Sequence, residues 1–144
     1  MRTIRFLAFI SFACNLFADE NLRLPNIFGD KMVLQRDKPV TLWGWAKAGA
    51  KVSAEFAGQN KFTKTNDKGI WTLQLDKLKT SFNGRKLVIT SGAEKITLTD
   101  ILVGEVWVCG GQSNMEWSLR SSRDSDLEVA SADSPHIRFI RLPH

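Results

Sequence analysis

The sequence predicts a β-sandwich followed by the beginning of an α/β domain, and two observations carry this prediction. From about residue 24 to residue 102, short β-rich runs alternate with turn signals, which is the pattern of an antiparallel sandwich. From Asp100 onward the sequence changes to an apolar run, a glycine corner, a helical stretch and a second apolar run. That order is typical of a βαβ unit. The predicted division is a leader over residues 1–18, a sandwich domain over 19–99 and an incomplete α/β domain over 100–144.

Seven runs in the first domain are candidate strands, separated by residues that favour turns. Proline fixes φ in Asp37-Lys38-Pro39, and glycine permits positive φ in Asn66-Asp67-Lys68-Gly69 and in Asn83-Gly84, so each of these segments is an expected turn. The expected strands are Met32–Gln35, Val40–Ala46, Lys51–Ala57, Lys61–Thr65, Trp71–Leu75, Lys86–Thr90 and Lys95–Thr99.

The second domain is expected to open with a buried strand. Val106–Cys109 shows no polar alternation, which indicates a strand that is covered on both faces, as in a parallel sheet. Residues 124–132 follow with apolar residues on one side of a predicted helix, which Pro135 ends. Ile137–Ile140 then predicts the second strand of the unit.

A serine lies just past the end of the first of these strands. Gly110 and Gly111 allow a sharp turn, and a helix that begins at Ser113 or Asn114 would direct free backbone N–H groups toward an oxyanion. The same residues have a purely structural interpretation, because Ser113 and Glu116 have the spacing of a helix capping box. Spacing alone therefore leaves open whether Ser113 is a nucleophile or a cap.

The octapeptide Gly110–Trp117 resembles the first sequence block of the SGNH hydrolases. It is most similar to the branch that contains sialate O-acetylesterases and related carbohydrate acetylesterases. Stretches upstream agree with the same branch, so the resemblance extends over nearly all residues after the first twenty. These stretches are Leu24–Asp30, Met32–Arg36, Val40–Ala46 and Val103–Trp107.

The resemblance implies a flavodoxin-like α/β hydrolase domain in which Ser113 is the nucleophile and its own backbone N–H is one oxyanion donor. Gly111, Gln112 and Asn114 flank the serine and are expected to shape the corner, with turn and cap chemistry as their alternative role. The implied activity is carbohydrate O-acetyl ester hydrolysis, in the first place of sialate O-acetyl esters, through an acetyl-enzyme and without metal or organic cofactor. The implied partner is an O-acetylated carbohydrate.

Two alternatives stay open at this point. One is an acetylxylan-type esterase of the same superfamily, and the other is a non-catalytic sandwich module that binds glycans. The resemblance also implies that the catalytic aspartate and histidine come from later sequence blocks. We therefore expect a C-terminal part of the hydrolase domain to be missing here and the chain alone to be inactive.

Asp133–His136 has the Asp-x-x-His spacing that this family uses for its acid and base, but its predicted position is wrong. In a right-handed βαβ unit both strands run in the same direction. Ser113 would follow the end of the first strand, whereas His136 would precede the second, roughly 15 Å away for five-residue strands. His136 is therefore expected not to act as the base. His144 is the last residue and is not assumed to be positioned.

Aromatic residues and one cysteine offer further candidate sites. Trp43, Trp45 and Trp71 suit the faces of sugar rings, but large aromatic residues usually fill interiors, and we expect core packing. Cys109 is expected to be a small buried residue of the strand, rather than a catalytic thiolate, because its sequence neighbours include no basic residue.

The first residues resemble a secretory leader. Met1–Arg5 is basic and Phe6–Ala13 is apolar, with plausible cleavage after Ala18, and the apolar run is too short to span a membrane. We expect a secreted or periplasmic protein; a lipid anchor at Cys14 is disfavoured because Phe12 is bulky for that signal.

Composition and charge agree with a globular enzyme or binding domain. Of the 144 residues, 43% are hydrophobic and 24% are charged, which is typical of soluble domains. The formal charge of +5 is spread along the chain rather than clustered, so no nucleic-acid partner is indicated.

Overall fold

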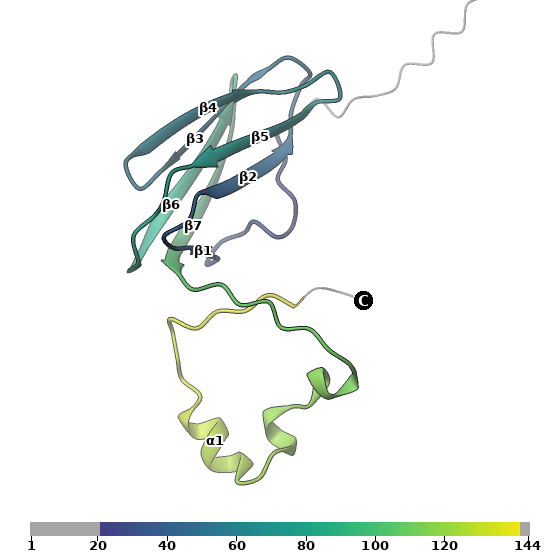
Figure 1. The fold of residues 1–144 in the computed structure, drawn as a ribbon, viewed down its shortest axis with the longest axis vertical. Helices are drawn as coiled ribbons and strands as arrows, with labels where there is room; N and C mark the ends of the chain where they lie inside the picture. Colours follow the sequence, from purple (N-terminus) through teal and green to yellow (C-terminus); the bar gives the residue numbers. More distant parts are fainter. Residues whose placement is uncertain (1–20, 142–144) are drawn as a thin grey trace, which may run out of the picture.

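The computed structural model describes residues 21–141 (Figure 1). The predicted leader, its Cys14 and the terminal His144 lie outside the described residues. Within residues 21–141 no helix is long and apolar enough to cross a membrane.

The sandwich consists of a five-stranded sheet and a two-stranded sheet. The larger sheet has the strand order β1-β7-β6-β3-β4, and β2 pairs with β5 in the smaller one. Neighbouring strands are antiparallel except β1 and β7, which are parallel. The strands are β1 (Val33–Gln35), β2 (Val40–Trp45), β3 (Lys51–Phe56), β4 (Gln59–Lys64), β5 (Ile70–Leu75), β6 (Ser81–Ser91) and β7 (Glu94–Gly104).

The hydrophobic core lies between the two sheets, where β2 and β5 cross in front of the larger sheet (Figure 1). Alternate residues of β2, β3 and β5 are buried, as expected for strands with one face toward a core. The largest fully buried side chains come from both sheets, and they are Trp71, Phe56, Leu42, Leu75, Leu87, Ile89, Ile101, Val52 and Val103.

All seven strands expected from the sequence are present, but β6 and β7 are much longer than expected. Asn83-Gly84 had the composition of a turn, yet it lies inside β6 at an irregularity of the β6–β7 pairing. There Gly84 packs directly against Asp100: a Cβ at position 84 would lie 2.1 Å from Asp100 Oδ1. The glycine therefore allows a close approach between strands and does not reverse the chain.

The expected βαβ unit is not formed in the described residues. Val106–Cys109 and Ile137–Ile140 are not strands, and Trp107 and Val108 are 84% and 97% exposed. A β-strand needs a neighbour for its backbone N–H and C=O groups, and within residues 105–141 no other strand supplies one. The part of the prediction that placed an α/β domain after residue 100 is thus not reproduced as regular structure.

Residues 105–141 instead form a wide loop that leaves the sandwich at the end of β7 and returns to it (Figure 1). It contains two short 3₁₀ helices and the helix α1, which matches the helix expected over residues 124–132. These elements are η1 (Ser113–Glu116), η2 (Leu119–Ser121) and α1 (Ser125–Ser131).

Two phenylalanines on neighbouring strands test where the core lies. Phe56 is 1% exposed and Phe62 is 56% exposed. Phe56→Ala should lower the free energy of unfolding by about 3–5 kcal/mol, because it removes a buried aromatic ring and leaves a cavity. Phe62→Ala is the matched control and should change it by less than about 1 kcal/mol, since Phe62 is largely exposed and the Lys51 ammonium lies 4.3 Å from its ring centroid. Equal losses in denaturant unfolding would contradict this core.

Candidate active site

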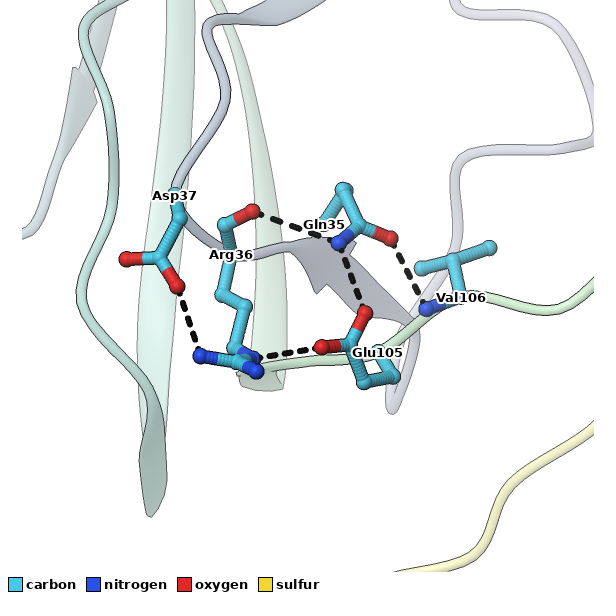
Figure 2. A network of polar contacts seen from close by, with 5 residues as sticks. All are labelled: Gln35, Arg36, Asp37, Glu105 and Val106. Carbon is cyan, nitrogen blue, oxygen red and sulfur yellow. Dashed lines mark hydrogen bonds and ion pairs between the residues drawn. The ribbon is translucent and has the colours of Figure 1, made fainter.

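A polar network fixes the point at which the chain leaves the sandwich toward Ser113 (Figure 2). The Gln35 side chain accepts a hydrogen bond from the Val106 N–H at 2.9 Å and donates one to Glu105 Oε2 at 2.9 Å. Arg36 Nε donates to Glu105 Oε1 at 2.6 Å, and the Arg36 N–H donates to the Gly104 carbonyl at 2.9 Å. We call Gln35, Arg36, Glu105 and Val106 the exit clamp, because they join β1 to the first residues after β7.

The charges of the exit clamp reinforce its hydrogen bonds. The hydrogen bond from Gln35, followed by that from Arg36, lowers the pKa of Glu105 below its ordinary value. In return, the hydrogen bond to Glu105 and its negative charge raise the pKa of Arg36. Asp37 adds a second carboxylate, 2.6 Å from Arg36. Within the clamp, Arg36 and Glu105 therefore form an ionised pair at neutral pH.

The corner that carries Ser113 is an exposed turn. Cys109–Ser113, Met115 and Glu116 line a depression, and Ser113 is the first residue of η1. Two backbone bonds close the turn: the Met115 N–H donates to the Gln112 carbonyl at 2.9 Å, and the Trp117 N–H donates to the Asn114 carbonyl at 3.2 Å. The backbone at this corner is thus folded around the serine without help from the sandwich.

The Ser113 side chain is not used as a helix cap. The N-cap residue of η1 is Gln112, and no side-chain capping hydrogen bond is made there. The Ser113 hydroxyl is exposed and makes no hydrogen bond to any residue from 21 to 141. Glu116, the other half of the possible capping box, instead accepts a hydrogen bond from Arg141 at 3.0 Å. The structure therefore leaves this hydroxyl available.

His136 lies elsewhere. Its ring packs against Phe82 of β6, with the two centroids 4.9 Å apart. In the described part of the chain, no hydrogen bond joins His136 to Ser113. No cluster of three metal-ligating side chains occurs among the same residues.

The three tryptophans do not share one environment. Trp71 is buried in the core, as expected, whereas Trp43 is 38% exposed and meets Phe28 edge to face, with centroids 4.6 Å apart. Trp45 is partly buried, with the Arg23 guanidinium 5.0 Å from its ring centroid. The expectation of core packing is thus wrong for Trp43, because strand alternation turns it to the outer face of β2.

Cys109 also differs from its expected place. It is a free, exposed cysteine and not a buried strand residue. The reason is the same as for Val108: the segment 106–109 has left the sheet and has no neighbouring strand to cover it.

Sequence reasoning missed the residues that hold this loop on the sandwich. Besides the exit clamp, Arg138 donates hydrogen bonds to the carbonyls of Lys31 and Asp100. Asp100 and Lys31 lie 38 and 107 residues before Arg138 in the sequence. The only sequence signal was the polar character of residues next to apolar runs, which does not identify a partner.

Exposure of Cys109 predicts a reactive thiol. In a Cys14→Ser variant, Cys109 should react with a thiol reagent such as DTNB within about tenfold of its rate in denaturant, because structural burial is what makes cysteines inert. The same variant in guanidinium is the control. Protection of about a hundredfold or more in the native chain would place Cys109 in a formed strand instead.

The exit clamp predicts a pH dependence. The folded-state pKa of Glu105 is lowered, so its stabilisation is fully present above the ordinary glutamate pKa of about 4.3 and is lost as the pH falls through the lower folded-state value. In a pH titration, the chemical shift of the Val106 amide should therefore change with a midpoint pH below that ordinary value. Glu105→Gln should abolish the transition, and the exposed Glu55→Gln should leave it intact. A midpoint at or above the ordinary value would argue against an ionised clamp.

Comparison with known proteins relates the chain to esterases. It is 32% identical over 131 residues to a protein from Rattus norvegicus named sialate O-acetylesterase, covering 83% of this chain and 24% of that protein. The protein of the same name from Homo sapiens is 31% identical over 131 residues, covering 81% of this chain and 25% of the relative. No family model matches the sequence.

A solved structure agrees with these relatives. A carbohydrate acetylesterase from Xanthomonas citri superposes with a TM-score of 0.76 at 33% sequence identity, over 80% of this chain and 26% of that enzyme. The chain thus spans about a quarter of the length of the proteins that it matches. It is homologous, over four fifths of its own length, to a portion of the sialate O-acetylesterases and of a related carbohydrate acetylesterase.

Proposed function

We propose that this sequence is part of a longer carbohydrate O-acetylesterase, secreted or periplasmic, in which Ser113 is the nucleophile. The observation that carries the proposal is the free Ser113 hydroxyl, exposed at a turn and engaged neither as a cap nor by another described residue. The named relatives support the class of substrate. They favour O-acetylated sialic acids first, with other acetylated carbohydrates as the wider class.

The proposed reaction proceeds in two steps. Ser113 Oγ attacks the acetyl carbonyl carbon while a base takes the hydroxyl proton, and the C–O bond to the sugar then breaks as the sugar oxygen receives a proton. Water attacks the acetyl-enzyme in the second step and releases acetate and free Ser113. In both steps the Ser113 N–H supports the oxyanion, and Gly111, Gln112 and Asn114 shape the turn that presents it.

The base is expected to come from residues beyond this sequence. Nucleophile and base must lie within hydrogen-bond reach, about 3 Å, and His136 packs against Phe82 instead. Further oxyanion donors would come from the same later residues. We therefore propose that the 144-residue chain alone hydrolyses esters poorly.

One observation favours a second candidate, a glycan-binding module without chemistry. Trp43 is partly exposed on the outer face of β2, and it meets the ring of Phe28, which also packs against the core. Aromatic faces of this kind suit sugar rings, but the pair needs no serine. Reactivity of Ser113 separates the two candidates.

The test is covalent labelling of the full-length protein that contains this sequence. A fluorophosphonate should label Ser113, and Ser113→Ala should abolish labelling and reduce acetate release by about a thousandfold or more. His136→Asn is the control and should retain both activities. Retention of more than about a tenth of the activity in Ser113→Ala would rule out this serine, since each 1.36 kcal/mol of barrier corresponds to tenfold in rate.

A further inference from the structure

The Arg138 side chain is bound by a set of hydrogen-bond acceptors on Lys31 and Asp100 of the sandwich, which we call the arginine site. Its guanidinium donates to the Lys31 carbonyl at 3.0 Å, to the Asp100 carbonyl, and to Asp100 Oδ2 at 2.9 Å. The Arg138 side chain is only 19% exposed. Planar guanidinium groups recognise such fixed sets of acceptors, whereas a lysine ammonium would satisfy fewer of them.

The arginine site depends on unusual backbone conformations. Lys31 and Asp100 both have positive φ, 64° and 56°, which non-glycine residues rarely adopt. Lys31 donates its N–H to the Thr99 carbonyl at 2.9 Å, while Asp30 accepts hydrogen bonds from the N–H and hydroxyl of Thr99. Gly84 leaves the room that the Asp100 side chain fills. Three segments of the sandwich thus cooperate to present two carbonyls and a carboxylate at one point.

The same short segment also reaches the serine corner. Arg141, three residues after Arg138, donates to Glu116 at 3.0 Å, and Glu116 is the last residue of η1. Residues 138–141 therefore connect the sandwich to the turn that begins with Ser113. The exit clamp holds the other end of the loop, at Glu105 and Val106.

These contacts differ in strength. Arg141 and Glu116 are 76% and 58% exposed, and exposed ion pairs contribute little on their own. Arg138 is partly buried and makes charge-assisted bonds to a carboxylate as well as bonds to carbonyls. Arg138 is thus the dominant attachment at the returning end of the loop.

We infer that Arg138 is a positioning residue, which docks the Ser113 corner on the sandwich so that the sandwich serves as a platform for the reaction. The short backbone segment from Arg138 to Arg141 carries this docking to the neighbourhood of η1, where the exposed Arg141–Glu116 pair adds little strength of its own. The inference deepens the proposed function and rests on it for its catalytic consequence, but the docking itself is a property of this chain.

The first arm of the test uses the 144-residue chain. In a Cys14→Ser, Lys86→Cys background, spin labels on Cys109 and on β6 should give one narrow distance distribution. Arg138→Met should broaden it, whereas Arg123→Met should not, because Arg123 is exposed and its one ion pair with residues 21–141 is to its neighbour Asp124 at 3.7 Å. Arg138→Lys keeps the charge and should broaden it to an intermediate degree. An unchanged distribution in Arg138→Met overturns the docking.

The second arm uses the full-length protein with its native cysteines. Arg138→Met should lower kcat and the rate of fluorophosphonate labelling at Ser113 by about tenfold or more, with little change in KM and with the melting temperature of the sandwich retained. Arg138→Lys should recover part of the loss, and Arg123→Met should behave as the parent. If the parent labels and Arg138→Met labels at the same rate, the inference is wrong. If the parent never labels at Ser113, the proposed function fails, and the first arm alone decides the docking.

Discussion

Every extended segment of this chain must find partners for its backbone N–H and C=O groups, and that requirement determines the rest of the structure. As far as Gly104 the requirement is met by neighbouring strands, which bury one apolar face between two sheets. After Gly104 no further strand is available in the described residues, and equally apolar sequence becomes an exposed loop. A side chain marks the boundary between the paired strands and the exposed loop. Where the strand pairing of β7 ends, the Gln35 side chain accepts the hydrogen bond of the Val106 N–H.

This boundary gives the sandwich a role beyond its own stability. The serine corner makes its closing hydrogen bonds internally, so its conformation is local, but its location depends on where the loop is attached, chiefly at the exit clamp and at Arg138. The exit clamp and Arg138 both make charge-assisted hydrogen bonds, and both use sandwich residues that lie far away in the sequence. A rigid sheet edge is a suitable place for such attachments, because reactive groups must be held to within fractions of an ångström.

The sequence predicted the sandwich well because periodicity and turn chemistry are local signals. The strand Ile70–Leu75 buries Trp71, Leu73 and Leu75 and exposes the residues between them, as its alternating pattern indicates, and Gly69 lies at positive φ in an expected turn. Asn83-Gly84 misled for a physical reason: glycine serves turns and close strand contacts equally, and only the position of Asp100 decides between them.

The candidate site was predictable in part. The serine and its flanking residues follow from a contiguous motif, whereas Arg138 and its acceptors do not, since no local pattern encodes contacts between segments 107 residues apart. The apolar run Val106–Cys109 shows that a clear local pattern can also predict the wrong structure. Its composition indicates a buried strand, but burial requires neighbours that the described residues do not include.

The most direct measurement of the central claim is rapid-quench mass spectrometry of the full-length protein during turnover of an O-acetylated sialic acid. The peptide containing Ser113 should transiently gain the mass of one acetyl group before steady state. Turnover with the acetyl group on a different residue, or with no acetylated peptide when the second step is made slow, would contradict it.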